Sequence, residues 1–150
     1  MAKVLACPVP PGSLLAEFGS STAYRDCFGR EVPGEVTLAE LIERFYCSPA
    51  FRPERLALGL IGRGASNADA RALASGEVQS FAAWNVVERR SQEILLQDFQ
   101  QATASWLSVR PGEGTTTLLF GSWVGRPERG VVKLLMPVHR FYSRVLLGGV

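Results

Sequence analysis

The chain has 150 residues, of which 47% are hydrophobic and 20% are charged, and its formal net charge is +2. This length suits one domain with its own core, and the composition argues against a disordered chain. The 16 basic residues are scattered rather than clustered, so the sequence gives little support for nucleic-acid binding.

Three cysteines, Cys7, Cys27 and Cys47, are evenly spaced and offer no close pair of ligands for a metal ion. Their odd number, and a short apolar start that Pro8 cuts off, favour reduced thiols and argue against a signal peptide. We therefore expect a cytoplasmic protein with no metal site and no cofactor.

Residues 1–22 are rich in Pro, Gly and Ser and are expected to form an irregular lead-in to a single domain over residues 23–150. A first strand is expected from Tyr24 to Val32. Thr37 and Glu40 have the spacing of a capping box, which predicts a helix with an apolar face from Leu38 to Phe45.

Two further helices are expected after this one. The first runs from Pro53 to Ile61 and ends at a glycine. The second is short, with Ser66 as its cap and Gly76 as its stop.

Strand patterns follow at residues 81–88, 93–99, 103–109 and 115–124, and they predict an antiparallel meander. In the third pattern, Ala104 and Trp106 share one face, whereas Leu107 and Val109 share the other. The segment Arg-Pro-Gly-Glu-Gly at 110–114 predicts a hairpin turn.

The apolar stretch from Val131 to Leu147 predicts a long amphipathic helix, bent at Pro137 because proline lacks the amide donor. Basic residues interrupt this stretch, and charges there would be costly in hydrocarbon. We therefore expect no membrane span.

The stretches 81–96, 102–109 and 134–142, with Pro-x-His-Arg at 137–140 as the most specific segment, resemble an uncharacterised bacterial family of START-like (SRPBCC) domains. Members are sometimes fused to NAD(P)-binding epimerase-like domains. The resemblance implies an α+β helix-grip fold, in which a curved antiparallel sheet wraps around a long C-terminal helix and two shorter helices follow the first strand. It also implies a cavity between sheet and helix that often holds an apolar or amphipathic ligand.

The elements expected to line that cavity carry the candidate ligand-binding residues Trp84, Trp106, Phe120, Trp123, Met136, His139 and Tyr142. Aromatic residues that face a cavity can bind a flat or aliphatic ligand, but such residues more often simply fill a core. The acidic residues Glu88, Glu93 and Asp98 are expected in turns or on exposed faces.

The only histidine, His139, is a weak candidate for a catalytic proton donor. Its plainer role is to cap a carbonyl that Pro137 leaves free, or to lie at the edge of the core. No local motif supplies a partner for it.

Three functions follow from these observations. The first is a binding module for a small hydrophobic or amphipathic molecule. The second is a cavity enzyme of the cyclase or isomerase type that uses His139 for proton transfer. The third is a protein-interaction module for a separate oxidoreductase, and a homo-oligomer is compatible with it.

Overall fold

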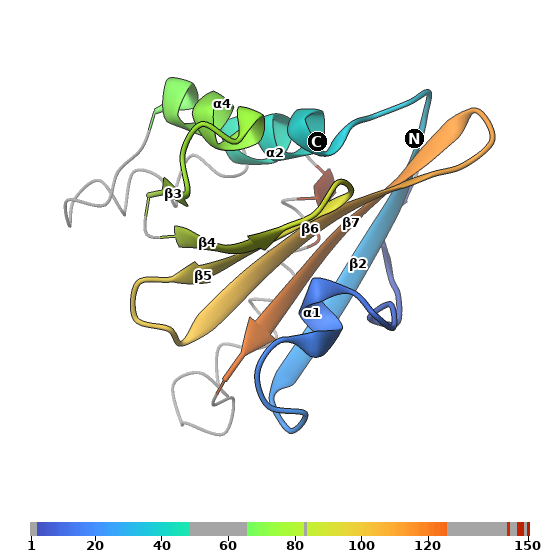
Figure 1. Cartoon of the computed structure of the whole chain (residues 1–150). Coiled ribbons are helices and arrows are strands. Elements are labelled where there is room, and N and C mark those ends of the chain that lie inside the picture. The colour runs from blue at the N-terminus through green and yellow to red at the C-terminus, as the bar shows by residue number, and fades with distance from the viewer. Residues whose placement is uncertain (1–2, 49–65, 83, 126–143, 145–146, 149) are drawn as a thin grey trace.

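The computed structural model describes residues 3–48, 66–82, 84–125, 144, 147, 148 and 150. These residues form one seven-stranded antiparallel sheet with three short helices packed against it (Figure 1). The strands are β1 (Leu5–Ala6), β2 (Tyr24–Pro33), β3 (Ser80–Phe81), β4 (Trp84–Arg89), β5 (Glu93–Asp98), β6 (Thr103–Pro111) and β7 (Thr115–Val124). The helices are α1 (Leu14–Glu17), α2 (Leu38–Cys47) and α4 (Asn67–Ser75).

The strands lie in the order β1-β2-β7-β6-β5-β4-β3, which confirms the predicted meander from β4 to β7. Strand β2 pairs with β7, the last strand of this meander. The predicted hairpin turn between β6 and β7 is also confirmed. The Gly112 amide donates to the Thr115 carbonyl at 2.9 Å. Gly114 has a φ of 71°, which glycine adopts without a steric penalty.

Helix α2 begins at the predicted capping box. The Glu40 amide donates to Thr37 Oγ1 at 3.2 Å, and the Thr37 amide donates to the Glu40 carboxylate at 2.7 Å. These bonds satisfy two of the amide groups that a helix start leaves free. The helix buries the apolar face that the sequence predicts, including Leu41, Ile42 and Phe45.

Helix α4 also confirms its prediction. Ser66 and Asp69 form a second capping box, and Gly76 ends the helix with a φ of 84°. The helix predicted from Pro53 to Ile61 lies outside the described residues.

The sheet carries a different core on each face, because side chains along a strand point alternately to opposite sides. In β5, Ile94 and Leu96 point to one face and Leu95 points to the other. The main core lies between the sheet and helices α2 and α4, which Figure 1 shows together on one side of the sheet. Its largest members are Phe28, Phe45, Tyr46, Phe81 and Phe120.

The second core lies on the opposite face, beneath α1. Its buried members are Leu14, Leu15, Cys27, Leu95, Ala104, Trp106, Leu119 and Trp123. Gly121 allows α1 to approach the sheet closely. A Cβ atom there would overlap Leu15 and would lie 2.8 Å from the Asp26 carbonyl oxygen. Residues 1–22, which we expect from the sequence to be irregular, therefore hold two regular elements, β1 and α1.

The described residues near the C-terminus contact the main-core face beside β2. Leu147 is fully buried in the main core. Arg30 Nη1 on β2 donates to the carbonyl oxygens of Gly148 and Val150, at 2.9 and 3.0 Å. These bonds tie the end of the chain to the sheet.

The predicted helix-grip fold is wrong. The part of the chain that the structure describes is mainly sheet with three short helices, and it contains no long C-terminal helix wrapped by that sheet. The predicted helix over 131–147 falls almost entirely outside the described residues. Apolar periodicity indicates that a segment can form an amphipathic helix, but it does not specify the surface that the helix covers. Among the described elements, α2 and α4 cover the main-core face.

Candidate functional site

The aromatic residues predicted to line one cavity lie on both faces of the sheet. Trp106 and Trp123 belong to the second core, beneath α1. Phe120 belongs to the main core, and Trp84 packs against the edge of that core. A cavity on one face therefore cannot be lined by all four of these residues. Met136, His139 and Tyr142 lie outside the described residues.

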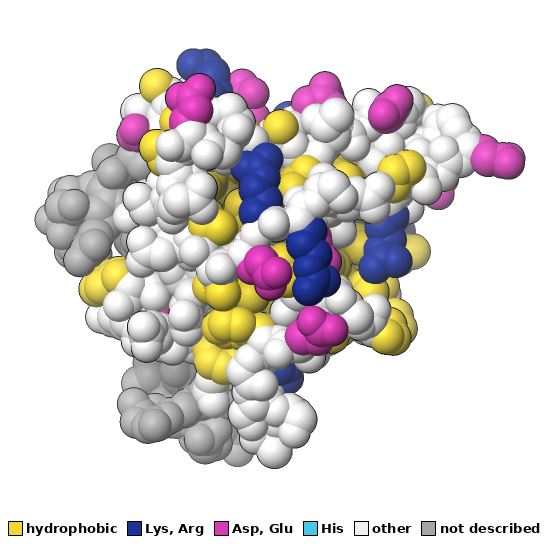
Figure 2. Space-filling model, in the orientation of Figure 1, with side chains coloured by type: hydrophobic (Ala, Val, Ile, Leu, Met, Phe, Trp, Pro, Cys, Tyr) yellow, Lys and Arg dark blue, Asp and Glu magenta, His cyan; other side chains and the backbone are white. Residues whose placement is uncertain are grey.

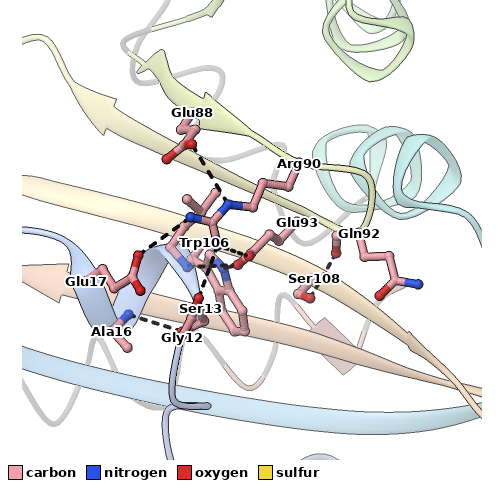
Figure 3. Close-up of polar contacts among 11 residues, drawn as sticks. Gly12, Ser13, Ala16, Glu17, Glu88, Arg90, Gln92, Glu93, Trp106 and Ser108 are labelled. Atoms are coloured by element: carbon pink, nitrogen blue, oxygen red, sulfur yellow. Dashed lines mark hydrogen bonds and ion pairs between the residues drawn. The ribbon is translucent and has the colours of Figure 1, made fainter.

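A polar cluster on the second-core face centres on the Glu93 carboxylate, at the start of β5 (Figure 3). Glu93 Oε2 accepts hydrogen bonds from Trp106 Nε1 at 2.7 Å and from the Leu14 amide at 2.9 Å. Glu93 Oε1 accepts one from Arg90 Nη1 at 3.2 Å. The Glu93 side chain is only 13% exposed, so the expectation of an exposed position is wrong for this residue. The expected turn role holds, because the Arg90 amide donates to the Glu93 carbonyl at 2.8 Å where β4 turns into β5.

Arg90 extends this cluster, as Figure 3 shows, and its side chain is 42% exposed. Its Nη1 also donates to the Gly12 carbonyl at 3.1 Å. Its guanidinium forms longer ion pairs with Glu17 at 3.6 Å and with Glu88 at 3.9 Å. Glu88 is exposed, as predicted, and ion pairs of this kind contribute little to stability.

Glu93 and Arg25 hold the two ends of α1. The Glu93 carboxylate meets the amide of Leu14 at the start of the helix. From β2, Arg25 Nε donates to the Leu15 carbonyl at 3.0 Å, and Arg25 Nη2 donates to the Phe18 carbonyl. A negative group at the start of a helix and a positive group at its end both interact favourably with the helix dipole. This cluster therefore has a structural role, since its charged groups are occupied in holding a four-residue helix on the sheet.

A groove of about 500 Å³ lies beside this cluster and is lined by residues 90–93, 108, 110 and 111. Several of its polar groups are already engaged in the fold. Ser108 Oγ donates to the Gln92 carbonyl at 2.9 Å, and Glu93 makes the bonds given above. The groove is open to solvent and has more polar than apolar lining, which does not suit a hydrophobic ligand.

The main-core face has a different feature, which we call the aromatic edge and define as Phe81, Ala82 and Trp84, where β3 turns into β4. Phe81 and Trp84 are paired across the two strands. The Phe81 ring lies 4.8 Å from the Tyr46 ring of α2, between centroids. Ala82 and Trp84 are partly buried against the main core, so the aromatic edge continues that core toward the surface.

Two energetically unfavourable features coincide at the aromatic edge. Trp84 Nε1 is buried, and it has no hydrogen-bond partner within the described part of the chain. A buried donor of this kind costs about 1–3 kcal/mol. Ala82 has a φ of 52°, a left-handed conformation that is uncommon for residues other than glycine. Such costs often cluster where a protein binds a ligand.

Trp123 provides a comparison on the opposite face. Its Nε1 is also buried without a partner among the described residues. Its ring, however, is enclosed by the protein's own second core: the Phe18 ring lies 4.9 Å away, and Gly19 lies directly against the indole. The Trp123 side chain is therefore buried by the protein itself, whereas the Trp84 side chain is partly exposed.

The remaining polar predictions concern turns, metals and charge. Asp98 has the predicted turn role, because its carboxylate accepts hydrogen bonds from the amides of Ala102 and Thr103. The described residues contain no group of three His, Cys, Asp or Glu side chains that could hold a metal ion. Their helices include none long and apolar enough to cross a membrane. On the face in Figure 2, basic side chains lie beside acidic ones rather than forming a continuous basic surface.

The chain was compared with known proteins in three ways. A scan against protein-family models, a search of curated proteins and a search of solved structures each found no match.

Proposed function

We propose that this protein binds a small amphipathic molecule at the aromatic edge. The apolar part of the ligand packs against Phe81, Ala82 and Trp84, and a polar acceptor on the ligand accepts a hydrogen bond from Trp84 Nε1. The proposal keeps the ligand class expected from the sequence. Of the four described aromatic residues that were predicted for the cavity, the proposal uses only Trp84, because the other three are packed inside the two cores.

The observation that supports the proposal is the buried Nε1 of Trp84, which has no hydrogen-bond partner among the described residues. Buried indole N–H groups usually find an acceptor, so a buried group without one suggests that a ligand supplies it. A partly exposed aromatic ring beside that group suits a ligand with an apolar body. Together these features favour a molecule with both an apolar part and an oxygen acceptor over a purely apolar one.

The test is a fluorescence titration with a dansyl-labelled fatty acid, which combines an apolar chain with oxygen acceptors. Trp84→Phe keeps an aromatic ring but removes the N–H donor. We expect this variant to bind the probe about fivefold more weakly, which corresponds to the loss of one hydrogen bond worth about 1 kcal/mol.

Trp123→Phe is the matched control, because it removes a second buried N–H without a described partner from the opposite face of the sheet. We expect it to bind the probe as the unchanged protein does. If both variants bound the probe equally weakly, the smaller ring would explain the effect, and the proposal that Trp84 Nε1 contacts the ligand would be refuted. A probe that the unchanged protein does not bind at all would also refute the proposal.

Native mass spectrometry of freshly purified protein then identifies a natural ligand. We expect a noncovalent adduct that the Trp84→Phe variant retains less well. The same spectrum reports the number of subunits. No contact among the described residues favours the cavity enzyme or the interaction module.

A further inference from the structure

Cys7 and Cys27 face each other across strands β1 and β2. The two strands are antiparallel, with Leu5 opposite Gly29 and Ala6 opposite Phe28. Continuing this register by one residue places Cys7 opposite Cys27. The Cys7 amide donates to the Cys27 carbonyl at 2.9 Å, and the two Sγ atoms lie 3.1 Å apart.

This geometry is close to that of a disulfide. Directly opposed residues of antiparallel strands have Cα atoms about 4.5–5.5 Å apart, and disulfides bridge Cα atoms separated by about 4.4–6.8 Å. Both thiols are free, so the sulfur atoms need to approach by only about 1 Å to reach a bond length of about 2.05 Å. We propose that Cys7 and Cys27 form a reversible disulfide on oxidation, without rearrangement of the fold.

The third cysteine is excluded from this reaction by its position. Cys47, at the end of α2, packs against the main core. Cys7 and Cys27 both belong to the second core, on the opposite face of the sheet. The folded protein therefore allows one pairing of its three thiols.

Burial and exposure indicate the order of events. Cys7 is partly exposed, whereas Cys27 is buried. Burial, the hydrogen bond with Cys7 and the nearby charge of Asp26 all raise the pKa of the Cys27 thiol. Cys27 therefore stays protonated, and an oxidant from solvent meets Cys7 first.

With hydrogen peroxide as the oxidant, the reaction has two steps. The Cys7 thiol first loses its proton to solvent, and the thiolate attacks one peroxide oxygen. The O–O bond breaks, which gives a sulfenic acid on Cys7 and releases hydroxide, and this hydroxide takes up the proton that Cys7 released to form water. The Cys27 sulfur then attacks the Cys7 sulfur, the S–O bond of the sulfenic acid breaks, and its hydroxyl takes the Cys27 proton and leaves as a second water. In total, two thiols and one peroxide give one disulfide and two waters.

The test treats the folded protein with dilute hydrogen peroxide, blocks the remaining thiols with iodoacetamide and digests the product with trypsin. Cleavage after Lys3, Arg25 and Arg30 places Cys7 in the peptide 4–25 and Cys27 in the peptide 26–30. We expect these two peptides to be joined, and dithiothreitol to separate them. The three free thiols should fall to one.

Two variants make the outcome decisive. Cys47→Ser should still give the joined peptides, because Cys47 lies on the other face. Cys7→Ser should give none. If the folded protein instead forms disulfides between molecules, or oxidises Cys47 while peptides 4–25 and 26–30 stay separate, the proposal is overturned.

Discussion

Glu93 connects three separate parts of the chain through one carboxylate. Its donors are the indole of Trp106 on β6, the amide of Leu14 on α1 and the guanidinium of Arg90 in the turn after β4. Hydrogen bonds to a charged group contribute about 1.5–3 kcal/mol, which is more than bonds between neutral groups contribute. The removal of this carboxylate should therefore affect α1 and the second core together.

We expect Glu93→Gln to lower the free energy of unfolding by about 1–3 kcal/mol, because a neutral amide accepts weaker hydrogen bonds at the same positions. Urea denaturation followed by tryptophan fluorescence measures this change. Glu88→Gln is the control: Glu88 also pairs with Arg90, but its side chain is 55% exposed, so a change below about 0.5 kcal/mol is expected. Similar losses in both variants would contradict a special role for Glu93.

The role of Glu93 could not be read from the sequence. A glutamate that follows the polar residues Arg89 to Gln92 looks like part of a turn, and its partners lie on elements distant in the chain. The alternation of Trp106 with Leu107 was predictable, because the period of two along a strand is a local property. The pairing of Glu93 with the Trp106 indole depends on strand register, which nonlocal contacts determine.

At the scale of elements, helices α1 and α2 form for different reasons. Helix α2 has a capping box and a continuous apolar face within its own sequence, so its start was predictable. Helix α1 has four residues, too few to be stable alone, and depends on Glu93 and Arg25 from the sheet. The expectation of an irregular segment there followed from local signals that carry no information on these partners.

The capping box of α2 predicts a pH effect. The hydrogen bonds from the Thr37 amide and then from the Thr37 hydroxyl lower the pKa of Glu40 below its ordinary value of 4.5. Since the folded pKa is depressed, the stabilisation is fully present above pH 4.5 and is lost as the pH falls through the lower folded value. We expect Glu40→Gln to destabilise the protein at neutral pH by at most about 1 kcal/mol, and the difference to vanish in acid.

Thermal unfolding of both proteins across this pH range measures the effect. Glu35→Gln is the control, because Glu35 is exposed and lies outside the capping box. A difference between Glu40→Gln and the unchanged protein that stays constant with pH would show that the carboxylate charge does not contribute.

For the whole molecule, the Cys7–Cys27 disulfide would close a loop of about 20 residues that contains α1. The chain-entropy model then predicts that the oxidised protein is more stable than the reduced one by about 3 kcal/mol. Urea denaturation with and without dithiothreitol measures the difference. The double variant Cys7→Ser/Cys27→Ser should show no effect of the reductant, and an equal effect in both proteins would assign the stabilisation elsewhere.

The sequence by itself determined the local elements: the capped helix α2, the short helix α4 with its glycine stop, the meander strands and the β6–β7 turn. Each follows from side chains within a few residues of one another. The tertiary structure alone decided what those elements cover, and so it replaced the expected helix-grip arrangement with a sheet that carries a separate core on each face. It also brought Cys7 to Cys27, Glu93 to α1 and Trp84 to the edge of the main core, because such contacts depend on strand order and register rather than on distance along the chain.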